Sequence, residues 1–291
     1  MTPKVKKRVN EILTTEKTGE IQKQRCENSS NVNKKLKSHN NICTDFSDSF
    51  INLETEHWKE LKQINYGPKV YYIYNPLEYA KQLHDDYIKK YCKAEKEVIL
   101  LGMNPGPWGM CQTGVPFGEV NFVKNWLQIE GNILKPDQEH ELRPITGLNC
   151  DRKEVSGDRM WSLLKELSGE PKVLFRHIFV HNYCPLAFLA ETGKNITPVD
   201  FKVKERKPLE AICDTYLLRA VELLNTKHLV CIGNYVKQRA EKAFAQADIT
   251  HVKISLMMHP SPANPAANKG WRAIAINQLK EAGILTLFNC S

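Results

Sequence analysis

Short apolar runs alternate with stretches of helical periodicity from about residue 50 onward, and this alternation limits the possible folds more than any other feature. The runs span residues 98–101, 173–180, 229–232 and 252–257, a length typical of buried strands. Strands that alternate with helices are joined by crossovers, so the pattern predicts a mainly parallel sheet with helices on both faces. We therefore expect an α/β fold with three layers, α/β/α.

Five segments around these runs place apolar residues three and four positions apart, as amphipathic helices do. We expect one of these helices to start near Pro208, because proline suits the first turn of a helix. The five segments span residues 77–91, 156–167, 209–224, 240–244 and 271–279.

The first 48 residues differ in composition from the rest of the chain. They are rich in Lys, Asn, Ser and Thr, and residues 1–40 carry ten Lys or Arg against four Glu. Such a segment cannot bury enough apolar surface to offset its ordering entropy, so we expect a disordered basic tail at 1–48 and a folded domain at 50–291. Its Lys-Val-Lys-Lys-Arg stretch at 4–8 fits either a nuclear import signal, which predicts a nuclear protein, or a plain solvated tail.

We expect neither a membrane protein nor one held together by disulfides. No run approaches the ~20 consecutive apolar residues that a membrane span needs, and the N-terminus lacks the apolar stretch of a secretory signal. The nine cysteines are scattered and form no Cys-x-x-Cys pair. Reduced thiols in a nuclear or cytosolic compartment are therefore expected, with no metal site and no cofactor.

Unusual polar residues follow three of the apolar runs, each in a loop that contains proline. Asn104 follows the first run, Asn182 follows the second, and His259 follows the fourth. Ligands of open α/β sheets bind outside the carboxyl ends of the strands. Each of these motifs is on its own also an ordinary turn, but their joint placement at one sheet edge predicts a binding site there.

The groups at this edge are amides and an imidazole. The chain has no Gly-x-Ser-x-Gly elbow, no P-loop, no Rossmann glycine motif and no acidic pair of the glycosidase kind. An Asn amide suits the donor and acceptor edge of a nucleobase, and a His can stabilise charge on the carbonyl oxygen of a departing base. A second Asn can hold a water in place without being a strong base.

Taken together, the motifs resemble those of the single-strand-selective monofunctional uracil-DNA glycosylase family. The resemblance lies in Gly-Met-Asn-Pro-Gly-Pro at 102–107, Gln-Thr-Gly-Val-Pro-Phe-Gly-Glu at 112–119, Phe-Val-His-Asn at 179–182 and His-Pro-Ser-Pro at 259–262. It covers about residues 70–288. It implies the three-layer fold of the uracil-DNA glycosylase superfamily and hydrolysis of uracil and 5-oxidised uracils, such as 5-hydroxymethyluracil, from single- and double-stranded DNA. It also implies a role in base-excision repair with no lyase step.

The resemblance assigns roles to individual residues. Asn104 would position the attacking water, and His259 would stabilise the charge that develops on uracil O2. Asn182 would hydrogen-bond to the uracil edge, and Phe117 would stack on the ring. The pocket wall would be formed by Met103, Gly106 and Met110.

Two segments are expected to contact DNA. The loop after His259 resembles the wedge that the family inserts into the base stack, and it contains Ser261, Pro262, Ala263, Asn264, Asn268 and Lys269. A basic segment would follow the sugar–phosphate backbone, with a plain solvated loop as the alternative, and it contains Lys194, Asn195, Lys202, Lys204 and Arg206.

Ala263 departs from the family pattern, which typically has Arg at this position. The substitution removes a long cationic side chain that would fill the gap in the stack and meet a phosphate. We expect weaker activity on duplex DNA and a stronger preference for single strands.

Two alternative functions remain open. One is a mismatch-type thymine or uracil glycosylase, whose motif also contains Asn-Pro-Gly, and residues 112–119 together with 259–262 disfavour it. The other is a protein that binds damaged DNA without turnover, and the presence of both Asn104 and His259 disfavours it. In each case DNA is the expected partner, and we expect a monomer.

Overall fold

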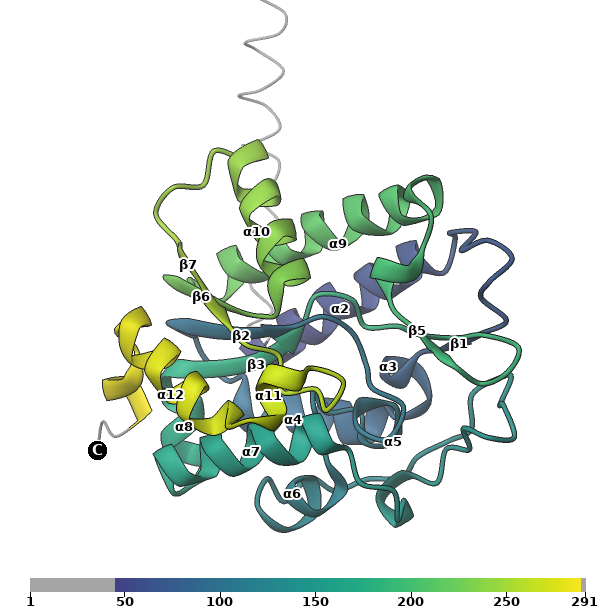
Figure 1. Cartoon of the computed structure of the whole chain (residues 1–291), viewed down its shortest axis with the longest axis horizontal. Coiled ribbons are helices and arrows are strands. Elements are labelled where there is room, and N and C mark those ends of the chain that lie inside the picture. The colour runs from purple at the N-terminus through teal and green to yellow at the C-terminus, as the bar shows by residue number, and fades with distance from the viewer. Residues whose placement is uncertain (1–44, 289–291) are drawn as a thin grey trace, which may run out of the picture. The chain divides into compact units, whose positions relative to one another are not determined.

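The computed structural model describes residues 45–288, and its core is a sheet of four parallel strands. The order across this sheet is β3-β2-β6-β7 (Figure 1). All five residues of β2 and β6 are buried, because these two strands lie in the middle of the sheet. The strands are β2 (Val98–Gly102), β3 (Ile178–Asn182), β6 (His228–Ile232) and β7 (Lys253–Met257).

Helices cover both faces of this sheet, which confirms the predicted α/β/α layers. Figure 1 shows α9 (Val203–Leu223) and α10 (Asn234–Gln246) on one face, and α7 (Val155–Ser168), α8 (Pro171–His177) and α12 (Trp271–Ala282) on the other. The remaining helices are α2 (Phe46–Leu61), α3 (Pro76–Tyr79), α4 (Lys81–Tyr91), α5 (Met110–Thr113), α6 (Val120–Asn125) and α11 (Pro265–Asn268), with short 3₁₀ turns at Gly147–Asn149, Pro198–Asp200 and Leu285–Phe288.

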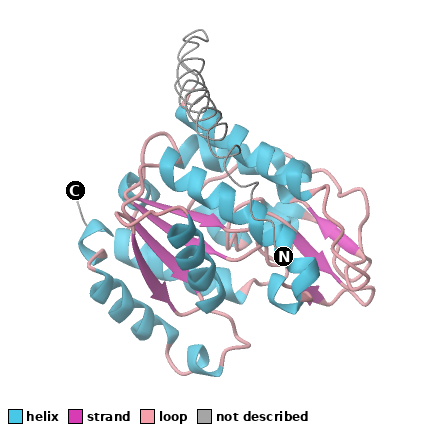
Figure 2. Ribbon diagram, turned by 90° about the horizontal axis from the view of Figure 1, so that it is seen from above, coloured by secondary structure: helices cyan, strands magenta, loops and turns pink. Residues whose placement is uncertain are grey.

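A second, antiparallel sheet was not predicted. It has the order β1-β4-β5 and lies apart from the parallel sheet (Figure 2). Strands this short contain too few residues to show a two-residue periodicity. Its strands are β1 (Tyr72–Tyr74), β4 (Ala187–Leu189) and β5 (Asn195–Ile196).

The predicted strand at 173–180 is wrong over its first five residues. Residues 171–177 form α8, whose first position is Pro171, and β3 begins only at Ile178. The helix buries Leu174 and Phe175, and the strand continues with a buried apolar residue. The two elements therefore join into one apolar run that periodicity cannot divide.

Two helix boundaries also differ from those expected. Helix α9 begins at Val203 rather than near Pro208, since the Glu205 side chain accepts a hydrogen bond from the Lys202 backbone N–H and so caps the helix earlier. The segment 77–91 forms two helices, α3 and α4, because Ala80 leaves helical geometry between them.

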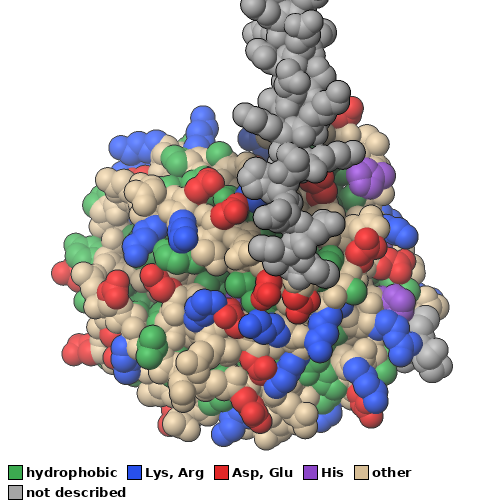
Figure 3. Space-filling model, turned by 180° about the vertical axis from the view of Figure 1, so that it is seen from behind, with side chains coloured by type: hydrophobic (Ala, Val, Ile, Leu, Met, Phe, Trp, Pro, Cys, Tyr) green, Lys and Arg blue, Asp and Glu red, His purple; other side chains and the backbone are tan. Residues whose placement is uncertain are grey.

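Several sequence expectations can be compared with the described residues. No helix within residues 45–288 has the combination of length and apolarity that crossing a bilayer requires. Six cysteines in this part carry free thiols. The predicted tail lies outside the described residues except for its last four, and α2 begins at Phe46. On the face seen in Figure 3, basic and acidic side chains of the described residues are interspersed rather than segregated.

Candidate active site

A cavity of about 490 Å³ lies at the carboxyl ends of β2 and β3, beside the loop that follows β7. Its volume is in the range of small-ligand sites. Three strand ends predicted to meet here do so, because Asn104, Asn182 and His259 all line the cavity. The other lining residues are Met103, Pro105, Gly106, Pro107, Gly109, Met110, Phe117, Glu154, Ser156, Asn195, Thr197, Ser261, Ala263 and Asn264.

Gly102 allows two of the cavity side chains to approach the backbone of β2. Gly102 pairs with Asn182 in the parallel ladder between β2 and β3. A Cβ atom at Gly102 would lie 2.3 Å from Oδ1 of Asn182 and 2.7 Å from Cε2 of Phe117. The amide and the aromatic ring therefore occupy the space that any other residue at this position would need.

The Asn182 amide is nearly fully buried, with 4% of the residue exposed. Its Nδ2 donates to Sδ of Met110 at 3.2 Å, and the amide has no other hydrogen bond within the described residues. A thioether is a weak acceptor. The carbonyl oxygen and the second N–H are thus available to a ligand that presents both a donor and an acceptor.

Phe117 is held in an unusual backbone conformation, with φ of +54°. Its carbonyl oxygen accepts hydrogen bonds from Nε1 of Trp161 at 3.0 Å and from the backbone N–H of Glu119 at 2.7 Å. A Cβ atom at Gly157 would lie 2.1 Å from the same oxygen, so Gly157 permits this close approach. The Phe117 ring lies 6.0 Å from the His259 ring, at 44° to it.

Asn104 is half-buried at the end of the segment that leaves β2. Its Nδ2 donates to the carbonyl oxygen of Leu186 at 3.3 Å. This bond orients the amide, and its oxygen makes no hydrogen bond within the described residues. An oriented amide oxygen can accept a hydrogen bond from a water molecule without removing a proton from it.

His259 is neutral at physiological pH in this environment. Burial lowers the pKa of its imidazole from 6.5 to about 4. The backbone N–H of Ser261 donates to Nδ1 at 3.1 Å, so the proton of the neutral ring resides on Nε2. The ring therefore offers a neutral hydrogen-bond donor to the cavity.

The loop after His259 is braced by an arginine that the sequence did not single out. Arg159, on α7, donates to the carbonyl oxygen of Pro260 at 2.9 Å and to Oδ1 of Asn268 at 2.8 Å. Asn268 in turn donates to the carbonyl oxygen of Pro262 at 2.7 Å. The Asn268 side chain thus stabilises the loop, although the sequence assigned it to DNA contact.

Other residues of the predicted wedge are divided between the cavity and the surface. Ser261, Ala263 and Asn264 line the cavity, and Asn264 also caps α11 by accepting from the Ala266 backbone N–H at 3.1 Å. Ala263 is exposed. Two members do not line the cavity and are exposed, namely Pro262 and Lys269.

Only one member of the predicted basic segment lines the cavity. Asn195 does so from β5, and its buried Oδ1 has no hydrogen-bond partner within residues 45–288. Arg206 forms an ion pair with Glu210, 3.1 Å between Nε and Oε1. The remaining members are exposed and lie away from the cavity wall, namely Lys194, Lys202 and Lys204.

Glu154 is a half-buried residue of the cavity wall that the sequence analysis missed. Burial raises its pKa, against hydrogen bonds from Ser156 and from the backbone N–H of Trp108. Cβ atoms at Gly106 and Gly109 would lie 2.8 Å from its Oε2 and 2.9 Å from its Cγ, respectively. Its only sequence signal was its position directly before α7, and an acidic residue near a helix N-terminus is ordinary.

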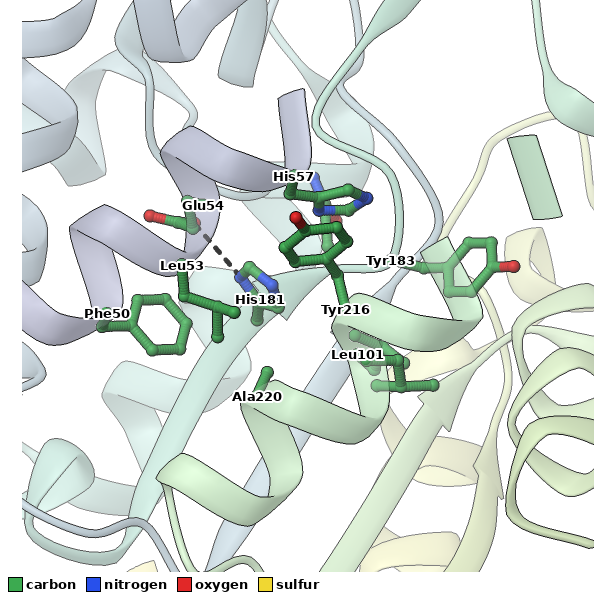
Figure 4. A pocket seen from close by; sticks show the side chains of 11 residues that line it. Phe50, Leu53, Glu54, His57, Leu101, His181, Tyr183, Tyr216 and Ala220 are labelled. Atoms are coloured by element: carbon green, nitrogen blue, oxygen red, sulfur yellow. Dashed lines mark ion pairs between the residues drawn. The ribbon is translucent and has the colours of Figure 1, made fainter. Parts of the chain in front are cut away.

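A buried cluster of ionisable groups lies behind Asn182, around a cavity of about 10 Å³ that has room for about one water. Figure 4 shows Glu54 of α2 facing His181 of β3, 3.6 Å between Oε1 and Nδ1. The other carboxylate oxygen of Glu54 accepts from Nε2 of His84 at 2.7 Å. This network joins α2 and α4 to the residue next to Asn182.

No group of three potential ligands within residues 45–288 has the arrangement of a metal site.

Comparisons with known proteins show which family and which fold this chain resembles. The model of the Uracil DNA glycosylase superfamily matches residues 89–280. The chain is 48% identical to the single-strand selective monofunctional uracil-DNA glycosylase of Rattus norvegicus over 83% of this chain and 86% of the relative. It is 47% identical to that of Mus musculus, over 84% and 88%. The crystal structure of wild-type SMUG2 from Pedobacter heparinus has a similar fold, with a TM-score of 0.59 at 19% identity, over 85% of this chain and all of the other.

Proposed function

This chain belongs to the uracil DNA glycosylase superfamily, and from this premise we propose that it hydrolyses the N-glycosidic bond of uracil in single-stranded DNA. The observation that supports the proposal best is the neutral His259, whose Nε2–H is a donor at the same cavity as the amides of Asn104 and Asn182. A departing uracil needs a donor for its oxygen, a reader for its edge and an ordered water.

The reaction breaks the bond between N1 of uracil and C1′ of the sugar. The electron pair goes to the base, and the negative charge spreads onto O2, where the His259 N–H meets it. Water held by the Asn104 amide oxygen adds to C1′ and loses a proton to solvent. His259 acts here as a neutral donor, because its ring is uncharged and carries its proton on Nε2.

Base recognition rests on the Asn182 amide and on the Phe117 ring. The carbonyl oxygen and the second N–H of Asn182 make no hydrogen bond within residues 45–288, and they match the N3–H donor and O4 acceptor of uracil. Phe117 lies against Gly102 beside this amide, in position to stack on a pyrimidine. No lysine lines the cavity within the described residues, which supports hydrolysis without a lyase step.

The base must leave the helix to reach this cavity, at a cost of a few kcal/mol in a duplex and less in a single strand. We extend the proposal to duplex DNA, at a lower rate because of this cost. We also extend it to 5-oxidised uracils, because Ser156 and Glu154 add polar groups to the cavity wall. We also propose that the protein acts in the nucleus. That proposal rests on the basic residues 4–8, which lie outside the described part.

The test is release of uracil from a single-stranded oligonucleotide by wild type, Asn104→Ala and His259→Ala. Each substitution is expected to lower the rate roughly 10²–10³-fold, the usual loss for one oriented donor or positioning group. His251→Ala is the matched control, since His251 is exposed and does not line the cavity. Equal rates in all four proteins would refute the site.

Two further measurements separate this function from its rivals. Faster release of thymine than of uracil opposite guanine would indicate a mismatch glycosylase. Tight binding of an abasic oligonucleotide with no free uracil released by the wild type would indicate a damage-binding protein without turnover.

A further inference from the structure

A cationic and aromatic cluster lies next to the cavity, in residues that neither the wedge nor the basic segment includes. Trp108 stands between Pro107 and Gly109, which both line the cavity. Its backbone N–H donates to the half-buried Glu154 carboxyl, so the Trp108 backbone is held at the cavity wall. Trp108 is therefore a residue at the margin of the cavity.

Two arginines lie over the Trp108 ring. The guanidinium carbons of Arg143 and Arg152 are 5.2 Å and 4.8 Å from the ring centroid. Both distances are within the range of cation–π attraction. The ring thus holds two positive charges at one place beside the cavity, although like charges repel each other.

Neither guanidinium is paired with a carboxylate in the described part of the chain. Arg143 donates to the neighbouring Leu142 carbonyl oxygen at 2.7 Å, and its buried Nε has no hydrogen-bond partner there. The guanidinium of Arg152 makes no hydrogen bond in this part of the chain. By contrast, four other arginines pair with acidic side chains, namely Arg206, Arg219, Arg239 and Arg272.

Guanidinium groups that no carboxylate neutralises suit phosphate, because their planar forks match two phosphate oxygens. Any nucleotide that enters the cavity carries phosphates on both sides, and these must lie near the cavity margin. We propose that Trp108, Arg143 and Arg152 form a phosphate clamp for the DNA strand beside the flipped nucleotide. The proposal rests on the proposed function, and it adds a strand-binding site separate from the loop after His259.

The test is the salt dependence of binding to a fluorescent single-stranded oligonucleotide, measured by anisotropy between 50 and 200 mM salt. Each phosphate contact that is lost lowers the slope of log K against log salt by about 0.7 for a single strand. Arg143→Gln and Arg152→Gln are each expected to lower the slope by about this amount. Trp108→Leu is expected to lower it as well, since the ring no longer holds the two arginines.

Two control variants distinguish the phosphate clamp from a general structural effect. Arg152→Lys keeps the charge on an exposed side chain and is expected to keep the slope. Arg219→Gln also removes an arginine that lies over an aromatic ring, 4.8 Å from the Tyr216 centroid, but that arginine is paired with Glu56. The slope is expected to stay unchanged in this variant.

Each outcome has a separate meaning. An unchanged slope in Arg152→Gln, or equal losses in Arg152→Gln and Arg152→Lys, would overturn the phosphate clamp. Uracil release by the wild type would leave the proposed function standing in that case. A wild type that releases no uracil would overturn the proposed function, while the binding slopes would still report on the phosphate clamp.

Discussion

Gly102→Ala places one methyl group against the two side chains that are proposed to read the base. The new Cβ would lie 2.3 Å from Oδ1 of Asn182 and 2.7 Å from Cε2 of Phe117. Contacts between carbon and these atoms normally need more than about 3 Å, so Asn182 has to move by roughly 1 Å and Phe117 by somewhat less. Asn182 has little room to move, because it is buried and bonded to Met110.

A displacement of about 1 Å at a reacting group can lower a rate by roughly 10²-fold. We therefore expect Gly102→Ala to lower single-turnover uracil release by about this factor. Overpacking of the same kind costs about 1–3 kcal/mol of stability, which thermal or urea unfolding would show.

Gly283→Ala separates a geometric effect from a loss of stability. Gly283 ends α12 with φ of +81°, and a Cβ atom there would meet nothing within 4 Å. Alanine in this left-handed conformation costs about 1–2 kcal/mol but does not disturb the cavity. A rate of uracil release in Gly102→Ala equal to that of the wild type would refute the reasoning. An equal loss of rate in Gly283→Ala would refute it as well.

Four further predictions concern His259 and the loop that follows it. Because burial lowers the pKa of His259 to about 4, uracil release should show no titration step near pH 6.5 and should fall only as pH approaches 4. The unfolded chain binds a proton at His259 as pH falls below 6.5, whereas the folded chain binds it only near pH 4. The free energy of unfolding should therefore fall as pH is lowered from 6.5 to 4. His259→Gln should abolish about 3 kcal/mol of that fall in unfolding measurements. Ala263→Arg should raise cleavage of duplex relative to single-stranded DNA, and an unchanged ratio would contradict this. Arg159→Gln removes the hydrogen bonds to Pro260 and Asn268, which should lower the free energy of unfolding by about 1–3 kcal/mol. It should reduce uracil release from duplexes more than from single strands. Equal losses on both substrates would argue against a wedge.

The sequence predicted the place of the site because strand ends follow a simple rule. Apolar runs such as 98–101 mark buried parallel strands, and the residue after each run must lie at the carboxyl edge of the sheet. Asn104 and His259 were found in this way. The proton on Nε2 of His259 was not, since it depends on a bond from the Ser261 backbone that only the folded loop creates.

Contacts between distant segments could not be predicted. Glu154 meets Gly106, and Arg143 meets Trp108, across separations of 35 residues and more. No periodicity encodes such contacts, because both partners lie in loops whose course is set by the packing around them. The boundary between the helix and the strand within 173–180 was not predicted, because both parts bury apolar residues.

The positive φ of Phe117 has a consequence for how this protein can change over evolutionary time. A bulky residue in the left-handed region is strained by about 1–2 kcal/mol, and the bonds from Trp161 and Glu119 and the bare Gly157 hold it there. Selection for thermal stability alone would favour Gly or Asn at this position, which tolerate the conformation but remove the ring that is proposed to stack on the base. Phe117 therefore serves catalysis at a cost in stability of the fold. Homologues adapted to heat should keep this residue and gain stability elsewhere in the chain.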